Sequence, residues 1–176
     1  MAMMDELPEL DMPQPLRTER LELRPFTREE LEAVADGRVL PHFGPGFPSA
    51  GDRDWARGAI EAGAHFATES PYSRFVGVEL TSGKIVGTGG FTGPVMNGEL
   101  ELEGSVVADR RNRGLASEAL AAFVERAFED PAVRAVHVSV PAETAEAEPA
   151  RRMLLRLGFA QRPSDGPEDS YHLPRP

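Results

Sequence analysis

The sequence predicts a single α+β domain, in which a mixed central sheet is flanked by helices. The chain has 176 residues and 40% of them are hydrophobic, which is enough for one core. Its segments alternate between strand and helix periodicity in the order β-α-α-β-β-β-α-β-α-β-β. The sequence contains no repeat and no linker long enough to divide the chain, so one domain is expected.

The first half of the chain predicts one strand, two helices and a hairpin. Residues 1–15 carry prolines and acidic residues without periodicity, so we expect a mobile tail followed by a domain over residues 16–176. Thr27 and Glu30 have capping-box spacing, which predicts a helix start. The predicted elements are a strand at 20–24, a helix at 27–39, an irregular segment at 41–48, a helix from Asp52 with Trp55, Ala59 and Ile60 as its apolar stripe, and hairpin strands at 75–80 and 84–92.

The second half begins at Asn97-Gly98, a tight-turn signal. Alternating Leu100 and Leu102 predict a strand at 99–107. Apolar residues at helical spacing then predict a helix that ends near residue 130. The remaining predicted elements are a strand at 135–140, a helix at 149–157 and short strands around Phe159 and at 171–173.

A basic turn joins the 99–107 strand to the helix that follows. It contains Arg110, Arg111, Arg113 and Gly114, in a chain whose net charge is −10. A helix N-terminus has backbone N–H groups without internal partners and the positive end of the helix dipole. Packed around a small residue, such groups can bind a pyrophosphate. Taken alone, the turn would favour an ordinary strand-to-helix connection with solvated arginines.

Several segments resemble one family. Residues 111–116, Arg-Asn-Arg-Gly-Leu-Ala, resemble the (Gln/Arg)-x-x-Gly-x-(Gly/Ala) acetyl-coenzyme A loop of the GNAT N-acetyltransferases. Residues 116–120 resemble the Ala-Thr-Glu-Ala-Leu of the RimJ/RimL-like branch, which acetylates the N-termini of ribosomal proteins. Residues 16–26 are similar to that branch's opening strand, and residues 151–159 to its late helix ending in Gly-Phe. The resemblance implies a GNAT-like fold and transfer of an acetyl group from acetyl-coenzyme A to a primary amine by direct attack.

The resemblance also implies a coenzyme site. Backbone groups of Ser105, Val106 and Val107 would face pantetheine and the thioester carbonyl. The loop and the helix start would bind the rest of the coenzyme through Arg111, Asn112, Arg113, Gly114, Leu115, Ala116 and Ser117.

The candidate general base lies on the strand before the loop. Glu99, Glu101 and Glu103 alternate and therefore share one face, which could be no more than the solvated side of a sheet. Aligned through the loop, Glu101 falls where many relatives have the Glu of a Glu-x-Gly-Tyr pattern, and Glu103 and Gly104 replace its Gly and Tyr. Like charges on one face disfavour each other's ionised form, which suits a base at neutral pH. We expect Glu101 to be the base, with Glu103 as the nearest alternative.

The general acid is not evident from the sequence. The family has polar residues in the late helix where this chain has Ala147, Ala150 and Leu154. Tyr171 and Ser139 are possible substitutes, although both residue types are common in sheets. These departures leave a second reading open, a non-catalytic acyl-coenzyme A-binding or regulatory module.

Composition narrows the cofactors and partners. The chain has no cysteine, and His42, His65, His137 and His172 lack metal-ligand spacing, so no metal is expected. The acidic charge argues against nucleic acid and fits a cationic amine, either a small molecule or a protein N-terminus. No apolar run or signal peptide indicates a membrane, so a cytoplasmic location is expected, and a homodimer is left open. A dinucleotide-binding redox protein is disfavoured, because residues 111–116 do not match Gly-x-Gly-x-x-Gly.

Overall fold

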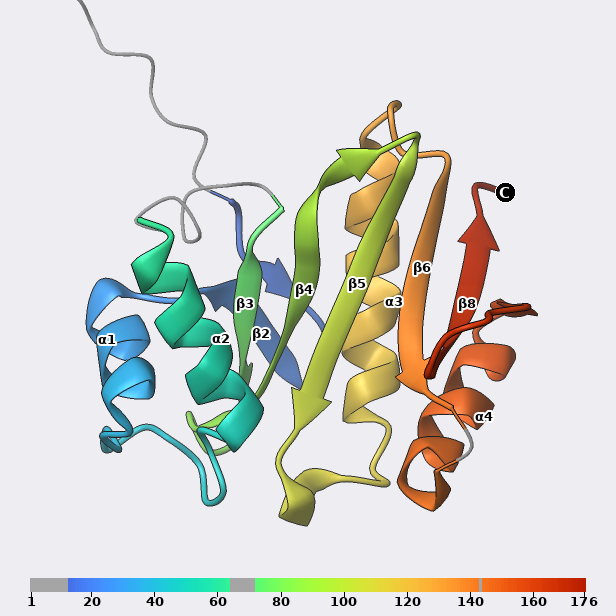
Figure 1. Cartoon of the computed structure of the whole chain (residues 1–176). Helices are drawn as coiled ribbons and strands as arrows, with labels where there is room; N and C mark the ends of the chain where they lie inside the picture. The colour runs from blue at the N-terminus through green and yellow to red at the C-terminus, as the bar shows by residue number, and fades with distance from the viewer. Residues whose placement is uncertain (1–12, 64–71, 143) are drawn as a thin grey trace, which may run out of the picture.

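The computed structural model describes residues 13–63, 72–142 and 144–176. Most of the expected N-terminal tail, together with His65, lies outside these residues. Within them, no helix is both long and apolar enough to cross a bilayer. The elements form a mixed sheet with helices on both faces, as the α+β prediction required (Figure 1).

The sheet has eight strands in the order β1-β2-β3-β4-β5-β6-β8-β7. The parallel pair is β5 with β6, and the other neighbours are antiparallel. The strands are β1 (Leu16–Arg17), β2 (Leu21–Pro25), β3 (Arg74–Glu79), β4 (Ile85–Met96), β5 (Glu99–Val106), β6 (Ala135–Pro141), β7 (Ala160–Arg162) and β8 (Glu168–Pro174).

The helices are α1 (Arg28–Asp36), α2 (Ala50–Glu61), α3 (Leu115–Glu129) and α4 (Glu148–Arg156), with short 3-10 turns at Ala108–Arg110 and Ala145–Ala147. Figure 1 shows α2 in front of β3, with α1 beside α2 at the left, and α3 behind β5. The front of β5, β6 and β8 is therefore not covered by a described helix.

Local chemistry explains where the helices start and stop. The predicted capping box at Thr27 begins α1, but the helix ends at Asp36 rather than at 39 because Gly37 adopts a left-handed φ of 73°. Helix α2 starts two residues before its predicted position, since Ser49 and Asp52 form a second capping box. The carboxylate of Asp52 also accepts a hydrogen bond from Thr88 on β4, which fixes α2 to the sheet.

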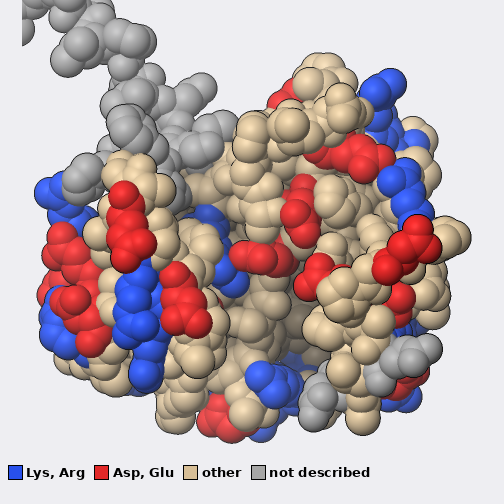
Figure 2. All heavy atoms as spheres, viewed as in Figure 1, with Lys and Arg blue, Asp and Glu red and all other residues tan. Residues whose placement is uncertain are grey.

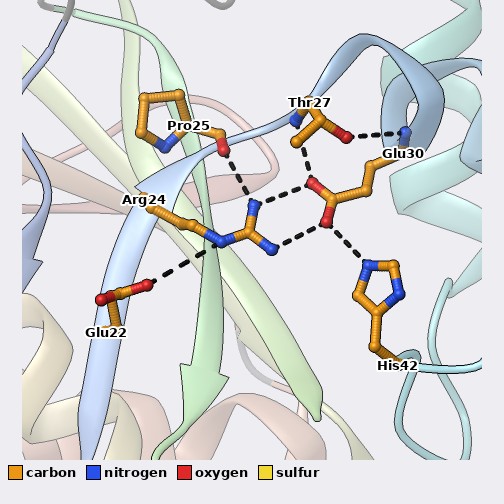
Figure 3. Close-up of polar contacts among 6 residues, drawn as sticks. All are labelled: Glu22, Arg24, Pro25, Thr27, Glu30 and His42. Atoms are coloured by element: carbon orange, nitrogen blue, oxygen red, sulfur yellow. Dashed lines mark hydrogen bonds and ion pairs between the residues drawn. The ribbon is translucent and has the colours of Figure 1, made fainter. Parts of the chain in front are cut away.

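A buried ion pair fixes α1 to β2 (Figure 3). Arg24 forms two hydrogen bonds, of 2.7 and 2.9 Å, with the carboxylate of Glu30, whose side chain is 3% exposed. The backbone N–H of Thr27 and Nε2 of His42 complete the contacts of this carboxylate. Burial favours the neutral form of Glu30, but the hydrogen bonds of Arg24, Thr27 and His42 outweigh it and lower the pKa to about 2.

Strands β5 and β6 diverge along their length. Their backbone pairing is confined to Glu99, Leu100 and Glu101 opposite residues 135–137, although both strands continue beyond it. Figure 1 shows them close together at their N-terminal ends and apart at their C-terminal ends, with α3 visible between them. Beyond Glu101, β5 pairs with β4 alone among the described strands.

The loop between α1 and α2 packs against the wide end of this opening. Phe43 and Phe47 are buried and contact each other edge to face, and Gly44 N–H donates to the Ile85 carbonyl on β4. A Cβ at Gly46 would lie 3.7 Å from Val107, directly after β5. The irregular segment predicted at 41–48 is therefore a well-packed loop beside the end of β5.

Candidate active site

The turn between β5 and α3 leaves helix amides without side-chain caps. Gly114 is the N-cap of α3, with a left-handed φ of 80°, and no side chain caps this helix end. Asn112 has a φ of 61°, so left-handed residues alternate along the loop, a geometry that turns successive N–H groups toward one side. Leu115 is buried beneath the loop, whereas Ala116 is exposed and Ser117 partly buried. The first turn of α3 therefore has uncapped amides, which is the geometry of helix ends that bind anions.

The loop arginines point in different directions. Nε of Arg110 pairs with Glu79 on β3 at 2.9 Å, so this guanidinium is turned away from β6. Nε of Arg111 donates to the carbonyl of Val106 at 2.9 Å and lies against β5. Arg113 is exposed, and its carbonyl accepts a hydrogen bond from Arg20. Of the arginines expected around the phosphate site, Arg110 thus serves mainly to fix the loop to β3.

A carboxylate within α3 fixes the helix start to the turn between β1 and β2. Glu118 accepts hydrogen bonds from the Thr18 hydroxyl at 2.6 Å and from the backbone N–H and Nε of Arg20 at 2.7 and 2.8 Å. Desolvation opposes its ionised form, but these donors outweigh that effect and lower the pKa of Glu118 below its usual value. Because the carboxylate of Glu118 is bound to Thr18 and Arg20, it does not cap the N-terminal amides of α3.

A small cavity borders the same loop. It has a volume of about 180 Å³ and is lined by Arg20, Glu79, Thr81, Arg113 and Leu115. A Cβ at Gly114 would lie 3.3 Å from Nη2 of Arg20, so the loop closely approaches this arginine, which lies in the turn between β1 and β2.

The predicted pantetheine contacts lie where β5 has separated from β6. Ser105 is exposed and Val106 partly buried, consistent with a strand that has lost one neighbour. The N–H of Val107 donates to Val86 on β4 at 2.8 Å, so it faces β4 rather than the opening. Because backbone groups alternate in direction along a strand, those of Val106 face the opening, where Arg111 contacts the carbonyl.

The strand glutamates share the face that α3 does not cover, as their alternation predicted. Figure 2 shows acidic side chains gathered at the centre of this face, above a hollow. Leu100 and Leu102, which alternate with them, are buried on the α3 side. The three carboxylates therefore border the open front of β5.

Their partners distinguish the three carboxylates. Glu103 pairs with Nη1 of Arg74 at 2.9 Å, and this guanidinium also lies over the ring of Trp55 at 5.1 Å. Glu99 pairs with Arg162 on β7 at 3.0 Å. Desolvation acts against ionised Glu99, but Arg162 and the neighbouring histidines outweigh it and lower the pKa of Glu99.

Glu101 has no arginine or lysine partner among the described residues. It accepts a hydrogen bond from the Thr92 hydroxyl at 2.8 Å, and Nε2 of His137 lies 3.9 Å from the same oxygen. Its side chain is 37% exposed on the open face. Of the two predicted bases, Glu101 is therefore the carboxylate available to a cation, while the charge of Glu103 is already compensated by Arg74.

The sequence interpretation missed His137. The sequence shows only that His137 lacks metal-ligand spacing, whereas the parallel register sets it directly opposite Glu101. Its Nδ1 is buried, makes no hydrogen bond with a described group and lies 3.9 Å from Glu99. A histidine in the middle of a predicted strand was the available signal, but register between strands is needed to interpret it.

The residues that replace the expected acid are apolar and packed. Leu154 is fully buried, Ala147 is 6% exposed and Ala150 packs against the same core. Tyr171 is 2% exposed within the core, and Ser139 is partly buried on the His137 face. Within the described residues, no group of three or more His, Asp and Glu side chains could hold a metal ion.

Comparison with protein families identifies the family of this chain. The model of the acetyltransferase (GNAT) domain matches residues 20–160. The chain belongs to the GNAT acetyltransferase family. This GNAT chain has no match among curated protein sequences. The family uses acetyl-coenzyme A, and the uncapped α3 amides, the close approach at Gly114 and the opening between β5 and β6 fit such a molecule.

Solved structures share the GNAT fold of this chain at low sequence identity. An acetyltransferase from Agrobacterium tumefaciens is 24% identical, with a TM-score of 0.66 over 92% of this chain and 95% of that one. RimJ from Mycobacterium smegmatis, solved with coenzyme A disulfide, is 19% identical, with a TM-score of 0.61 over 92% and 86%. A ribosomal-protein-S5-alanine acetyltransferase from Vibrio fischeri is 14% identical, with a TM-score of 0.61 over 92% and 96%.

Proposed function

We propose that this protein transfers an acetyl group from acetyl-coenzyme A to a primary amine by direct attack, with Glu101 as the general base. The observation that carries the proposal is Glu101 itself. It is a carboxylate without a cationic arginine or lysine partner among the described residues, and it lies on β5 close to where that strand leaves β6. A positively charged amine that entered the open face would find this carboxylate uncompensated.

Different groups of the chain bind the coenzyme and transfer the proton. The first-turn amides of α3 and the exposed Arg113 bind the anionic part of the coenzyme, and the free edge of β5 orients its extended arm. When bound, the coenzyme supplies the activated acetyl group and a thiol leaving group. Glu101 takes one proton from the acceptor ammonium, directly or through a water molecule, so that the nitrogen lone pair becomes available. The Thr92 hydroxyl holds the carboxylate in place for this step.

We assign the acceptor to the class of primary amines that carry one positive charge, with the α-amine of a peptide as the first choice. Arg162 and Arg74 compensate Glu99 and Glu103, so the centre of the face retains about one uncompensated carboxylate. A peptide α-amine has a pKa of about 7.7–8.0, so near neutral pH most of it carries the single proton that the base must remove. The named acceptor of the Vibrio fischeri relative, a ribosomal protein, supports the same choice.

A panel of acceptors followed by thiol release tests the proposal. The panel contains short peptides with N-terminal alanine or serine, a polyamine and an amino sugar, each with wild type and with Glu101→Gln and Glu103→Gln. We expect a peptide to be acetylated by wild type, and Glu101→Gln to lower the rate on the order of 10²–10⁴-fold while coenzyme binding is kept. If Glu103→Gln causes the larger loss, Glu101 is not the base.

The alternative is a non-catalytic coenzyme-binding module, and the packed Leu154 and Ala147 are the observations in its favour. Neither side chain can protonate a thiolate. A thiolate with a pKa of about 8.5 is nevertheless a tolerable leaving group without a protein acid. Tight binding of coenzyme A with no acetylation of any member of the panel would support the module and contradict the enzyme.

A further inference from the structure

We infer that His137 is a positioning residue that acts through Glu101, by accepting from it, across a bridging water molecule, the proton that the acceptor amine gives up. The inference rests on the proposed function, because it concerns the route of the proton at the same site. It goes beyond the assignment of the base, since His137 lies on a different strand and need not touch the amine.

The geometry around the imidazole defines its role. Nε2 of His137 lies 3.9 Å from Oε2 of Glu101, and Nδ1 lies 3.9 Å from Oε2 of Glu99. Each ring nitrogen therefore faces a carboxylate of β5. A hydrogen on Nδ1 directed at Glu99 leaves the lone pair of Nε2 facing Glu101, so the neutral ring is oriented to accept a proton on that side.

The surroundings stabilise the ring once it is charged. An imidazolium at this position lies between two carboxylates, with attractive interactions on both sides. From β8, His172 is the residue directly opposite His137. His172 contacts Glu99 at 3.4 Å and Nη2 of Arg162 at 2.6 Å, so its own polar contacts are with these two residues and not with Glu101.

The proton balance of the reaction explains why a second proton acceptor beside Glu101 would be useful. Transfer of an acetyl group from a thioester to an ammonium forms an amide and a thiol and releases one proton overall. Glu101 can hold the first proton, but it must be ionised again before the next ammonium binds. Passing that proton to His137, whose side chain is 26% exposed, restores the carboxylate and provides a route to water.

The alternative role for His137 is purely structural, as a packed strand residue. A structural residue would affect stability or substrate binding without altering the pH dependence of turnover. His172→Gln provides a matched control, because it removes a histidine from the same sheet face that contacts Glu99 but is not paired with Glu101 in the structure.

The kinetic test compares the pH profiles of wild type, His137→Gln and His172→Gln on an N-terminal alanine peptide. We expect His137→Gln to lower kcat about tenfold at pH 7.5 with little change in KM for acetyl-coenzyme A. The acid limb of its pH profile should move to lower pH, because the second proton acceptor has been removed. An acid limb that stays in place, or an equal change in His172→Gln, would overturn the inference.

A second measurement does not depend on activity. The ring signals of His137 are followed by NMR across pH in wild type and in Glu101→Gln. Removing the facing charge should lower the titration midpoint of His137 and move that of His172 less. An unchanged His137 midpoint refutes the coupling even in an active enzyme. If wild type acetylates no amine, the proposed function fails, while this titration still decides whether the two groups are coupled.

Discussion

Replacing Glu30 with glutamine tests the buried ion pair that joins α1 to β2. The substitution keeps the size of the side chain but removes the charge that faces Arg24 and His42 (Figure 3). The pKa of Glu30 is about 2 instead of the ordinary 4.5. At about 1.4 kcal/mol for each unit of pKa, that difference corresponds to roughly 3 kcal/mol of folding stability at pH 7. The side chain is 3% exposed, so solvent screening does not reduce this value much.

The pH dependence of this stabilisation has a definite sign. Because the pKa of Glu30 is lower in the folded chain than in the unfolded one, its contribution is complete above about pH 5 and is lost as the pH falls toward 2. By pH 3 the unfolded chain has taken up the proton while the folded chain has not, which leaves about 1.4 kcal/mol. The difference between wild type and Glu30→Gln should therefore fall by more than half between pH 7 and pH 3.

Urea unfolding at both pH values measures this difference. Glu32→Gln is the matched control on the same helix, because its carboxylate is 55% exposed and lies 4.0 Å from Arg28. Exposed pairs of this kind contribute about 0.3–0.5 kcal/mol. Equal losses for Glu30→Gln at pH 7 and pH 3 would refute the charge argument, and a loss no larger than that of Glu32→Gln would refute the ion pair altogether.

Three further predictions concern the coenzyme loop and the base. Gly114→Ala should weaken coenzyme A binding at least tenfold by calorimetry, since its Cβ crowds the loop. Gly93→Ala is the control, because Gly93 has a similar left-handed φ and a Cβ there would have no described atom within 4 Å. This variant should introduce the same backbone strain but keep full affinity for coenzyme A. Glu118→Gln should lower the free energy of unfolding by about 1.5–3 kcal/mol at pH 7. The loss should be smaller near pH 3, because the pKa of Glu118 is lowered in the folded chain and its contribution to stability disappears on acidification. A loss that is independent of pH would contradict this. The rate deficit of Glu101→Gln should be largest at low pH and narrow at high pH, where the free amine needs no base; a deficit that does not vary with pH would assign Glu101 a structural role.

Local sequence signals predicted most of the fold. The capping box at Thr27, the turn at Asn97-Gly98 and the apolar spacing of α3 depend on neighbouring residues, and each lies where it was expected. Strand β1 was missed, because two residues carry no periodicity and Leu16 becomes a strand only by pairing with Leu23. The short strand expected around Phe159 begins one residue later, since Phe159 itself is buried in the core.

The candidate site was less predictable, because it depends on contacts between distant residues. Alternation showed that Glu101 and Glu103 share a face, and the structure has them on one face. What distinguishes them is Arg74, which is far away in the sequence and reaches Glu103 through the pairing of β3, β4 and β5. The position of His137 beside Glu101 likewise follows from the register of a parallel pair, which no local pattern encodes.

The short pairing between β5 and β6 predicts that coenzyme binding would stabilise the sheet. The backbone ladder that joins β6, β8 and β7 to the rest of the sheet consists of the pairs that Glu99, Leu100 and Glu101 make with residues 135–137. A ligand arm lying along the open edge of β5 would act as a missing strand segment and extend the sheet's hydrogen bonding into the opening. Amides near the C-terminal ends of β5 and β6 should therefore exchange with solvent more slowly when coenzyme A is bound, so that filling the site also tightens the seam between the two parts of the sheet.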